Sequence, residues 1–202
     1  MDRLWGFGGW EVEQTHETLR PYLVEETYEL LDAFDGGDDA EIASELGDLL
    51  LQVLFHARIA QAQGRFTVDD VARALVDKLT RRSPHLTNGH TGPLDAVSQD
   101  AAWHARKTTE RSGSCLDGIP PAQPSLALAE KIIARSRKAG LPDDLVPAEL
   151  RAVRLDGSGQ AEARLRAAAL AFADRFRAAE ARAAEESLRT PMSAEQWYSH
   201  WC

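Results

Sequence analysis

Apolar residues in the first third of the chain recur every three or four positions, which is the spacing of one helix face. The first stripe follows Pro21, a residue suited to a first helical turn, and stops at Gly36 and Gly37. A second stripe begins at Ile42 and ends near Gly64. The pattern predicts two long helices joined by a tight turn.

Polar residues mark the ends of these helices. Asp38 with Glu41, and Thr67 with Asp70, have the spacing of capping boxes that would open the second helix and a third one. The pair at 83–84, Ser-Pro, would end the third helix, because proline cannot continue it.

The rest of the chain is typical of helices separated by loops. We expect a fourth helix over about residues 95–111, a fifth from about 125 to 139, and a long one over 160–188, a segment with 12 alanines. No segment alternates apolar and polar residues at the period of two that a half-buried strand requires. The sequence therefore predicts an all-α fold of the helical-bundle type.

Composition suggests how this chain of 202 residues is organised and where it works. Residues 113–124, rich in Gly, Pro and Ser, would link a first domain (1–112) to a second helical region (125–202). No apolar run approaches the ~20 residues of a membrane helix, and the first residues do not resemble a secretory signal. We expect a cytoplasmic protein that is not bound to a membrane, with Cys115 and Cys202 as free thiols.

Negative charge is concentrated near the N-terminus. Residues 11–48 contain 13 acidic residues and one basic residue, whereas the formal net charge of the whole chain is −9. This balance argues against nonspecific binding of nucleic acid. An acidic segment of this kind is either a solvated face or a site for hard cations.

The spacing of the carboxylates favours a site. Glu26 and Glu29 lie three apart on the first helix, as Glu45 and Asp48 do on the second, and residues three apart share a helix face. Both cross-helix pairs, 26 with 48 and 29 with 45, are centred on position 37, which is the turn. In an antiparallel hairpin Glu26 should therefore face Asp48, and Glu29 should face Glu45.

The negative charge of four converging carboxylates needs a positive charge to neutralise it. Glu26 lies on the side that the first helix should bury, where unpaired carboxylates are costly. Arg20 and Arg58 are the nearby basic residues, and spacing places neither of them well. A divalent cation with oxygen ligands, Mg²⁺, Mn²⁺ or Ca²⁺ rather than zinc, would neutralise the cluster. Gly47, inside the second helix, would allow a ligand or a helix to approach. The alternative is that these charges face solvent on two amphipathic helices.

Basic and aromatic residues further along could bind a nucleotide. Lys78 and Arg82 share a helix face flanked by Arg81, and such side chains neutralise phosphates. Trp103 and Lys107 are also four apart, so they could stack on a base and hold a phosphate. The alternatives are an ordinary basic helix end and a buried tryptophan.

Two motifs in order, EETYEL (25–30) and ELGDLLLQVLFHARIA (45–60), strongly resemble the MazG nucleotide pyrophosphohydrolases. The mark of that family is E-E-x-x-E followed by E-x-x-D. The similarity extends over roughly residues 10–139 and includes WEVEQTHETL (10–19), DKLTRRSPH (77–85) and WHARKTTER (103–111).

The resemblance implies a helical homodimer that hydrolyses nucleoside triphosphates, ribo or deoxy, to monophosphate and pyrophosphate with Mg²⁺, for which Mn²⁺ could substitute. It implies that Glu25 either supports the metal ligands or helps to orient the attacking water. The metal ligands would be Glu26, Glu29, Glu45 and Asp48. The phosphates would be held by Lys78, Arg81 and Arg82. The nucleotide pocket would be completed by Trp103 and Lys107.

The chain departs from the family pattern in several places. Gly8 and Gly9 replace the usual Cys-Pro, and Ser83 stands in place of a histidine. Residues 125–202 resemble a shortened second copy of the domain. In it Ala169, Ala171 and Asp174 replace the Asn, Lys and Arg of the phosphate-binding helix. We therefore expect this copy to be catalytically inactive and to support packing or dimerisation.

Three other functions are alternatives for a helical protein with these acidic and basic residues. A related pyrophosphatase could be specific for dUTP, dCTP or a phosphoribosyl nucleotide, and a regulator could bind Mg²⁺ and nucleotide without turnover. A di-iron bundle is disfavoured because it needs two Glu-x-x-His pairs, and one is present, at 13–16. The histidines form no ligand pattern and are interpreted as structural or surface groups: His16, His56, His85, His90, His104 and His200.

Overall fold

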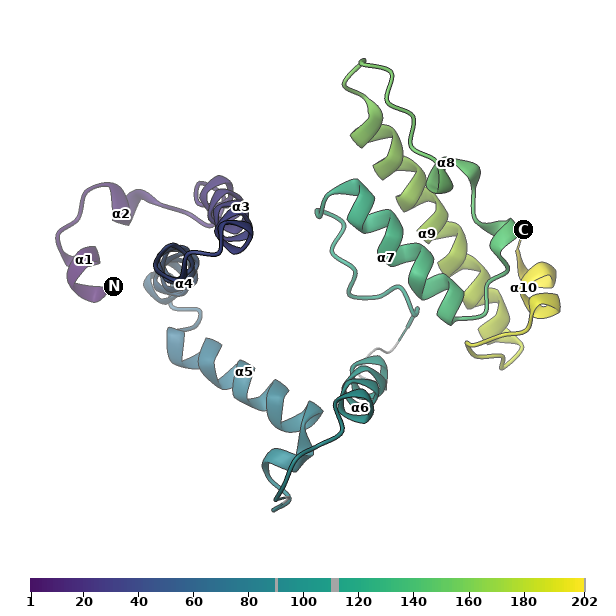
Figure 1. Ribbon diagram of the computed structural model, residues 1–202, viewed down its shortest axis with the longest axis horizontal. Coiled ribbons are helices and arrows are strands. Elements are labelled where there is room, and N and C mark those ends of the chain that lie inside the picture. Colours follow the sequence, from purple (N-terminus) through teal and green to yellow (C-terminus); the bar gives the residue numbers. More distant parts are fainter. Residues whose placement is uncertain (90, 110–112, 202) are drawn as a thin grey trace. The chain divides into compact units, whose positions relative to one another are not determined.

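The computed structural model describes residues 1–89, 91–109 and 113–201, and these residues form helices and no strands. This confirms the all-α prediction. The helices are α1 (Asp2–Gly6), α2 (Trp10–Glu13), α3 (Arg20–Gly36), α4 (Asp39–Ala62), α5 (Val68–Arg82), α6 (Ala96–Thr109), α7 (Ser125–Lys138), α8 (Ala148–Arg151), α9 (Ala161–Glu185) and α10 (Ala194–His200) (Figure 1). Single 3₁₀ turns occur at Pro84–Leu86 and Asp143–Leu145.

The chain divides into two compact units, Met1–Pro93 and Leu94–Cys202. The division precedes α6, the helix that the sequence grouped with the first domain. The expected domain end at residue 112, the last residues of the fourth predicted helix, His90 and Cys202 lie outside the described residues. No helix in the described part of the chain is both long enough and apolar enough to cross a membrane.

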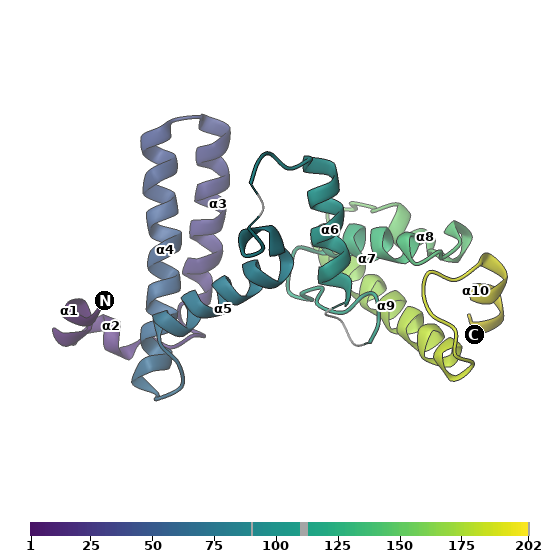
Figure 2. The ribbon, with the colours of Figure 1, turned by 90° about the horizontal axis from the view of Figure 1, so that it is seen from below.

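The first unit is organised around a helical hairpin. Helices α3 and α4 pack side by side and antiparallel, as the two apolar stripes predict (Figure 2). Gly37 ends α3 with φ 73°, a left-handed conformation that glycine adopts without a Cβ clash. Its amide N–H donates to the carbonyl of Ala33 at 3.0 Å. This turn sets the register in which α4 returns along α3.

The helix caps agree only partly with the sequence pattern. Thr67 and Asp70 form the expected capping box at the start of α5. At the start of α4 the side chain of Asp38 accepts a hydrogen bond from the amide of Ala40 at 2.8 Å. The capping box predicted with Glu41 was wrong, because this closer amide occupies the Asp38 carboxylate.

The core of the first unit is small. Leu19, Phe55 and Ile59 are buried together, with Met1, Trp5 and Leu51 packed against them. Much of both apolar stripes remains uncovered, and α5 contains no buried residue. The large apolar side chains that stay exposed on α3, α4 and α5 are Tyr22, Val24, Tyr28, Leu31, Phe34, Leu46, Leu50, Val53, Val68, Leu75, Val76 and Leu79. Among the described residues, most of the apolar surface on the outer faces of the hairpin therefore stays exposed, although Tyr22 contacts Trp10.

The second unit is packed much more densely. Helices α7 and α9 lie side by side, and α10 packs against α9 (Figure 1). Trp197 is 0% exposed, and its indole N–H donates to the carbonyl of Ala139 at 3.0 Å. Phe176 lies against it, with 4.7 Å between ring centroids. Phe176 belongs to α9, whose alanines Ala169, Ala173, Ala179 and Ala183 are buried in the same core.

Trp197 should be the main stabilising side chain of the second unit. We expect Trp197→Ala to lower the free energy of unfolding by about 3–5 kcal/mol, because it leaves a large cavity in the core of this unit. Leu155 is 81% exposed and supplies the control: Leu155→Ala should change the free energy of unfolding by less than about 0.5 kcal/mol. Urea denaturation followed by circular dichroism measures both, and equal effects would contradict this account.

Candidate metal site

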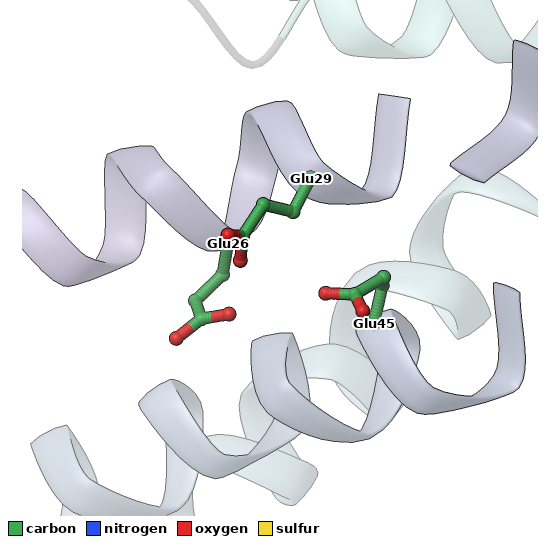
Figure 3. A group of neighbouring side chains, drawn as sticks. All are labelled: Glu26, Glu29 and Glu45. Atoms are coloured by element: carbon green, nitrogen blue, oxygen red, sulfur yellow. The ribbon is translucent and has the colours of Figure 1, made fainter. Parts of the chain in front are cut away.

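The hairpin brings acidic side chains from two helices to one place. Carboxylate oxygens of Glu26, Glu29 and Glu45 all lie within 4.8 Å of one another. Figure 3 shows Glu26 and Glu29 extending from α3 toward α4, and Glu45 extending from α4 toward α3. The sequence predicted this convergence from the shared midpoint at position 37.

Asp48 is the fourth acidic residue of this cluster. It is not among the three whose oxygens lie within 4.8 Å. Among the neighbouring charges, that of Asp48 nevertheless raises the pKa of Glu26 most, and that of Glu29 raises the pKa of Glu45 most. These strongest couplings follow the pairing expected from the hairpin register.

The cluster is poorly suited to full ionisation without a cation. Partial burial and then the charges of Asp48, Glu29 and Glu45 raise the pKa of Glu26. Partial burial, Glu29, Asp48 and Glu41 likewise raise the pKa of Glu45. Convergent carboxylate oxygens with no nitrogen or sulfur donor form the ligand set preferred by Mg²⁺ and related hard cations. The residues present therefore fit such an ion.

The nearby basic residues are engaged elsewhere. Arg20 pairs with Glu17 at 2.8 Å. Arg58 pairs with Asp2 at 3.2 Å, and its guanidinium lies 4.8 Å from the ring centroid of Trp5. As the spacing indicated, neither arginine compensates the carboxylate cluster.

The other predicted site residues are not among the three whose oxygens converge. Glu25 is an exposed residue of α3. Lys78, Arg81 and Arg82 are on α5, which leaves the hairpin beyond the end of α4 (Figure 2). All charges that act appreciably on Glu26 and Glu45 are acidic. Trp103 and Lys107 lie on α6, in the second unit, and their place in the site stays a prediction.

The sequence interpretation missed a polar chain beside the cluster. His16 and His56 contact each other through their Nδ1 atoms at 2.8 Å, and the guanidinium of Arg65 reaches Nε2 of His16. Gln52, 5% exposed, lies one turn after Asp48, and its Oε1 has no hydrogen-bond partner among the described residues. The signal was the periodicity of α4: positions 48, 52 and 56 share one face.

Gly47 has no crowded neighbour within the chain. A Cβ added there would meet no atom within 4 Å among the described residues. Packing inside the first unit therefore does not require glycine at this position, although glycine in a helix costs ~1 kcal/mol relative to alanine.

Fold and site together define a class: an all-α protein with a cluster of carboxylates on a helical hairpin. The model of the MazG nucleotide pyrophosphohydrolase domain matches residues 14–87, which include the whole carboxylate cluster. Relatives named nucleoside triphosphate pyrophosphohydrolase occur in Mycobacterium tuberculosis and Mycolicibacterium smegmatis, at 46% and 45% identity over the whole of this chain. The chain belongs to the MazG nucleotide pyrophosphohydrolase family.

The relatives are longer than this chain. It spans 66% and 67% of the two mycobacterial proteins. A Thermotoga maritima relative, named nucleoside triphosphate pyrophosphohydrolase/pyrophosphatase MazG, is 41% identical over 65% of this chain and 51% of its own length. The similarity to all three extends beyond the segment matched by the family model.

The raised pKa values predict how the cluster affects metal-free stability. A carboxyl whose folded pKa exceeds its unfolded value of about 4.5 holds more protons when folded, so it destabilises the fold as pH rises through that window. In EDTA, Glu45→Gln should therefore stabilise the protein at pH 7.5, and the gain should shrink toward pH 5. Urea denaturation at both pH values measures it.

Glu130, an exposed residue of α7, provides the matched control. Glu130→Gln should leave the free energy of unfolding nearly unchanged at both pH values. A Glu45→Gln variant that is less stable than the parent protein at pH 7.5 would argue against mutual repulsion within the cluster.

Proposed function

We propose that this chain hydrolyses nucleoside triphosphates, ribo or deoxy, to nucleoside monophosphate and pyrophosphate in a Mg²⁺-dependent reaction. The carboxylate cluster on the α3–α4 hairpin is the observation that carries the proposal. Membership of the MazG family and the printed names of its relatives support it. We place the reaction in the cytoplasm, where it would act on the nucleotide pool.

The residues of the first unit would divide the work by their chemistry. Glu26, Glu29, Glu45 and Asp48 would hold Mg²⁺, with Mn²⁺ as a substitute. The ion would neutralise phosphate charge and make water more acidic. Glu25 would orient the attacking water toward the α-phosphorus, because its carboxylate can accept a proton from water.

The remaining predicted residues would bind the nucleotide. Lys78 and Arg82, helped by Arg81, would hold the phosphates and stabilise the negative charge of the departing pyrophosphate. Trp103 and Lys107 would complete the nucleotide pocket. The second unit would act as an inactive, shortened copy of the domain that supports packing.

We also propose that the working form is a homodimer in which a second copy covers the apolar faces of α3, α4 and α5. Supporting this, the large apolar side chains that are buried among the described residues of this unit are Leu19, Leu30, Phe55 and Ile59, so the unit buries little apolar surface for its own stability. Contiguous exposed apolar surface of this kind is typical of an interface. Gly47 would then allow a close approach to α4.

Product analysis tests the activity. Purified protein incubated with each NTP and dNTP plus Mg²⁺ should release monophosphate and pyrophosphate in equal amounts. Glu29→Gln should reduce kcat by at least about 10²-fold, because it removes one anionic ligand of the cation. The helical circular dichroism spectrum should be unchanged.

Each alternative gives a different result. Diphosphate plus phosphate would refute the cleaved bond. Binding of nucleotide without turnover would favour a sensor, and turnover confined to one base would indicate a specific pyrophosphatase. Glu130→Gln is the control variant and should retain full activity. Full activity of Glu29→Gln would remove this residue from the site.

The dimer can be tested by disrupting the apolar face. Leu50 is an exposed residue of α4, so Leu50→Asp should move the mass measured by light scattering from dimer to monomer, because a buried aspartate lacks a partner. Leu155→Asp, on an exposed apolar residue of the second unit, is the control and should leave the mass unchanged. A parent protein that is monomeric at micromolar concentration would refute the dimer.

A further inference from the structure

The contacts of Arg65 fix the proton positions in the His16–His56 pair. A guanidinium has no hydrogen-bond acceptor, so Nε2 of His16 must accept from Arg65 and carries no proton. Neutral His16 then carries its proton on Nδ1 and donates it to Nδ1 of His56, 2.8 Å away. His56 must therefore hold its own proton on Nε2. One arrangement satisfies both contacts, with both rings neutral.

This chain of three side chains ties together segments that are distant in sequence. His16 precedes α3, His56 lies on α4, and Arg65 is in the turn that leads into α5. The contacts therefore join positions 40 and 49 residues apart. They fix the α4–α5 corner against the base of the hairpin, at the end opposite Gly37.

Helix α5 starts at this corner, and its side chains stay largely at the surface. No residue of α5 is buried in this chain. Lys78 lies 13 residues after Arg65, about 20 Å along a helix, so a tilt of about 10° at the corner would move it by about 3 Å. A displacement of that size exceeds the tolerance of a hydrogen bond to phosphate.

We propose that Arg65, His16 and His56 form a positioning chain that sets the direction of α5, and with it the phosphate-binding side chains, relative to the carboxylate cluster. This inference rests on the proposed hydrolysis of nucleoside triphosphates. The three residues do not touch the reacting atoms, and they act through Lys78 and Arg82.

The surroundings of His56 favour its neutral form. Among the described residues, neither imidazole pairs with a carboxylate: Glu17 pairs with Arg20, and Asp2 pairs with Arg58. Arg65 is the cation that faces the pair. A proton added to either ring would break one of the two contacts and place a second positive charge beside Arg65.

The positioning chain should depend on pH through His56. Partial burial, and then the charge of His16, lower the pKa of His56 from its ordinary value of about 6.5. A histidine of this kind loses its contribution to the fold as pH falls below about 6.5, because the unfolded chain binds the proton more readily. The positioning chain should therefore be intact at pH 8 and broken in acid.

Kinetics with Mg²⁺ and the nucleotide that is turned over fastest test the proposal. At pH 8, Arg65→Met should raise KM about tenfold and change kcat less than about twofold, because it weakens binding rather than the chemical step. The ratio of its KM to that of the parent protein should fall toward one as pH is lowered to 5.5. His56→Asn, whose Oδ1 can accept in place of Nδ1, should keep KM near the parent value, whereas His56→Leu should not.

Arg73→Met is the matched control. Arg73 is an exposed residue of α5 that pairs with Asp70 and does not belong to the positioning chain, so KM should stay within about twofold of the parent value. The double variant Arg65→Met/His56→Leu should be no worse than the poorer single variant if both residues act in one chain.

Tautomers give a readout that does not depend on activity. ¹⁵N spectra at pH 8 should show His16 protonated at Nδ1 and His56 protonated at Nε2, with this pattern lost in Arg65→Met. The positioning chain would be refuted by the opposite tautomers, by an unchanged KM in Arg65→Met, or by a KM ratio that does not vary with pH. None of these results would affect the proposed hydrolysis of nucleoside triphosphates. Absence of turnover in the parent protein would overturn the proposed function as well.

Discussion

The first unit depends on holding mutually repelling carboxylates together. The α3 face that carries Glu26 also buries Leu30 and Ala33 on the turn side, and Leu19 packs with Phe55 at the opposite end of the hairpin. Apolar contacts on both sides thus keep the acidic pairs between two closely packed helices. The cost appears as raised pKa values, which a hard cation would relieve.

This arrangement explains why the two units are built so differently. In the first unit, the inner face of the hairpin carries the carboxylates, and much of the apolar surface of α3 and α4 stays exposed. In the second unit, α9 contributes a nearly continuous apolar face that includes Phe176, and Trp197 and Trp201 cover it within the same chain. One unit completes its own core, whereas the other combines a small core with a polar site.

The site was predictable where it depends on local periodicity. Glu26, Glu29, Glu45 and Asp48 follow from helical spacing and one turn, because a tight hairpin converts sequence distance into facing pairs. The His16–His56–Arg65 chain could not be found in this way. Its members lie in three segments, and the entry of the chain into α3 and the angle of the α4–α5 corner decide whether they meet.

The sequence by itself determined the helices, the hairpin register, the acidic cluster and the family, because each is encoded in spacing over a few helical turns. Tertiary structure decided which apolar stripes are buried. Tyr28, Leu31 and Leu50 have the spacing of core residues and remain exposed, since the facing sides of α3 and α4 are already used. It also decided that α5 leaves the hairpin, because helix direction depends on long-range contacts at a corner and not on the periodicity of the helix.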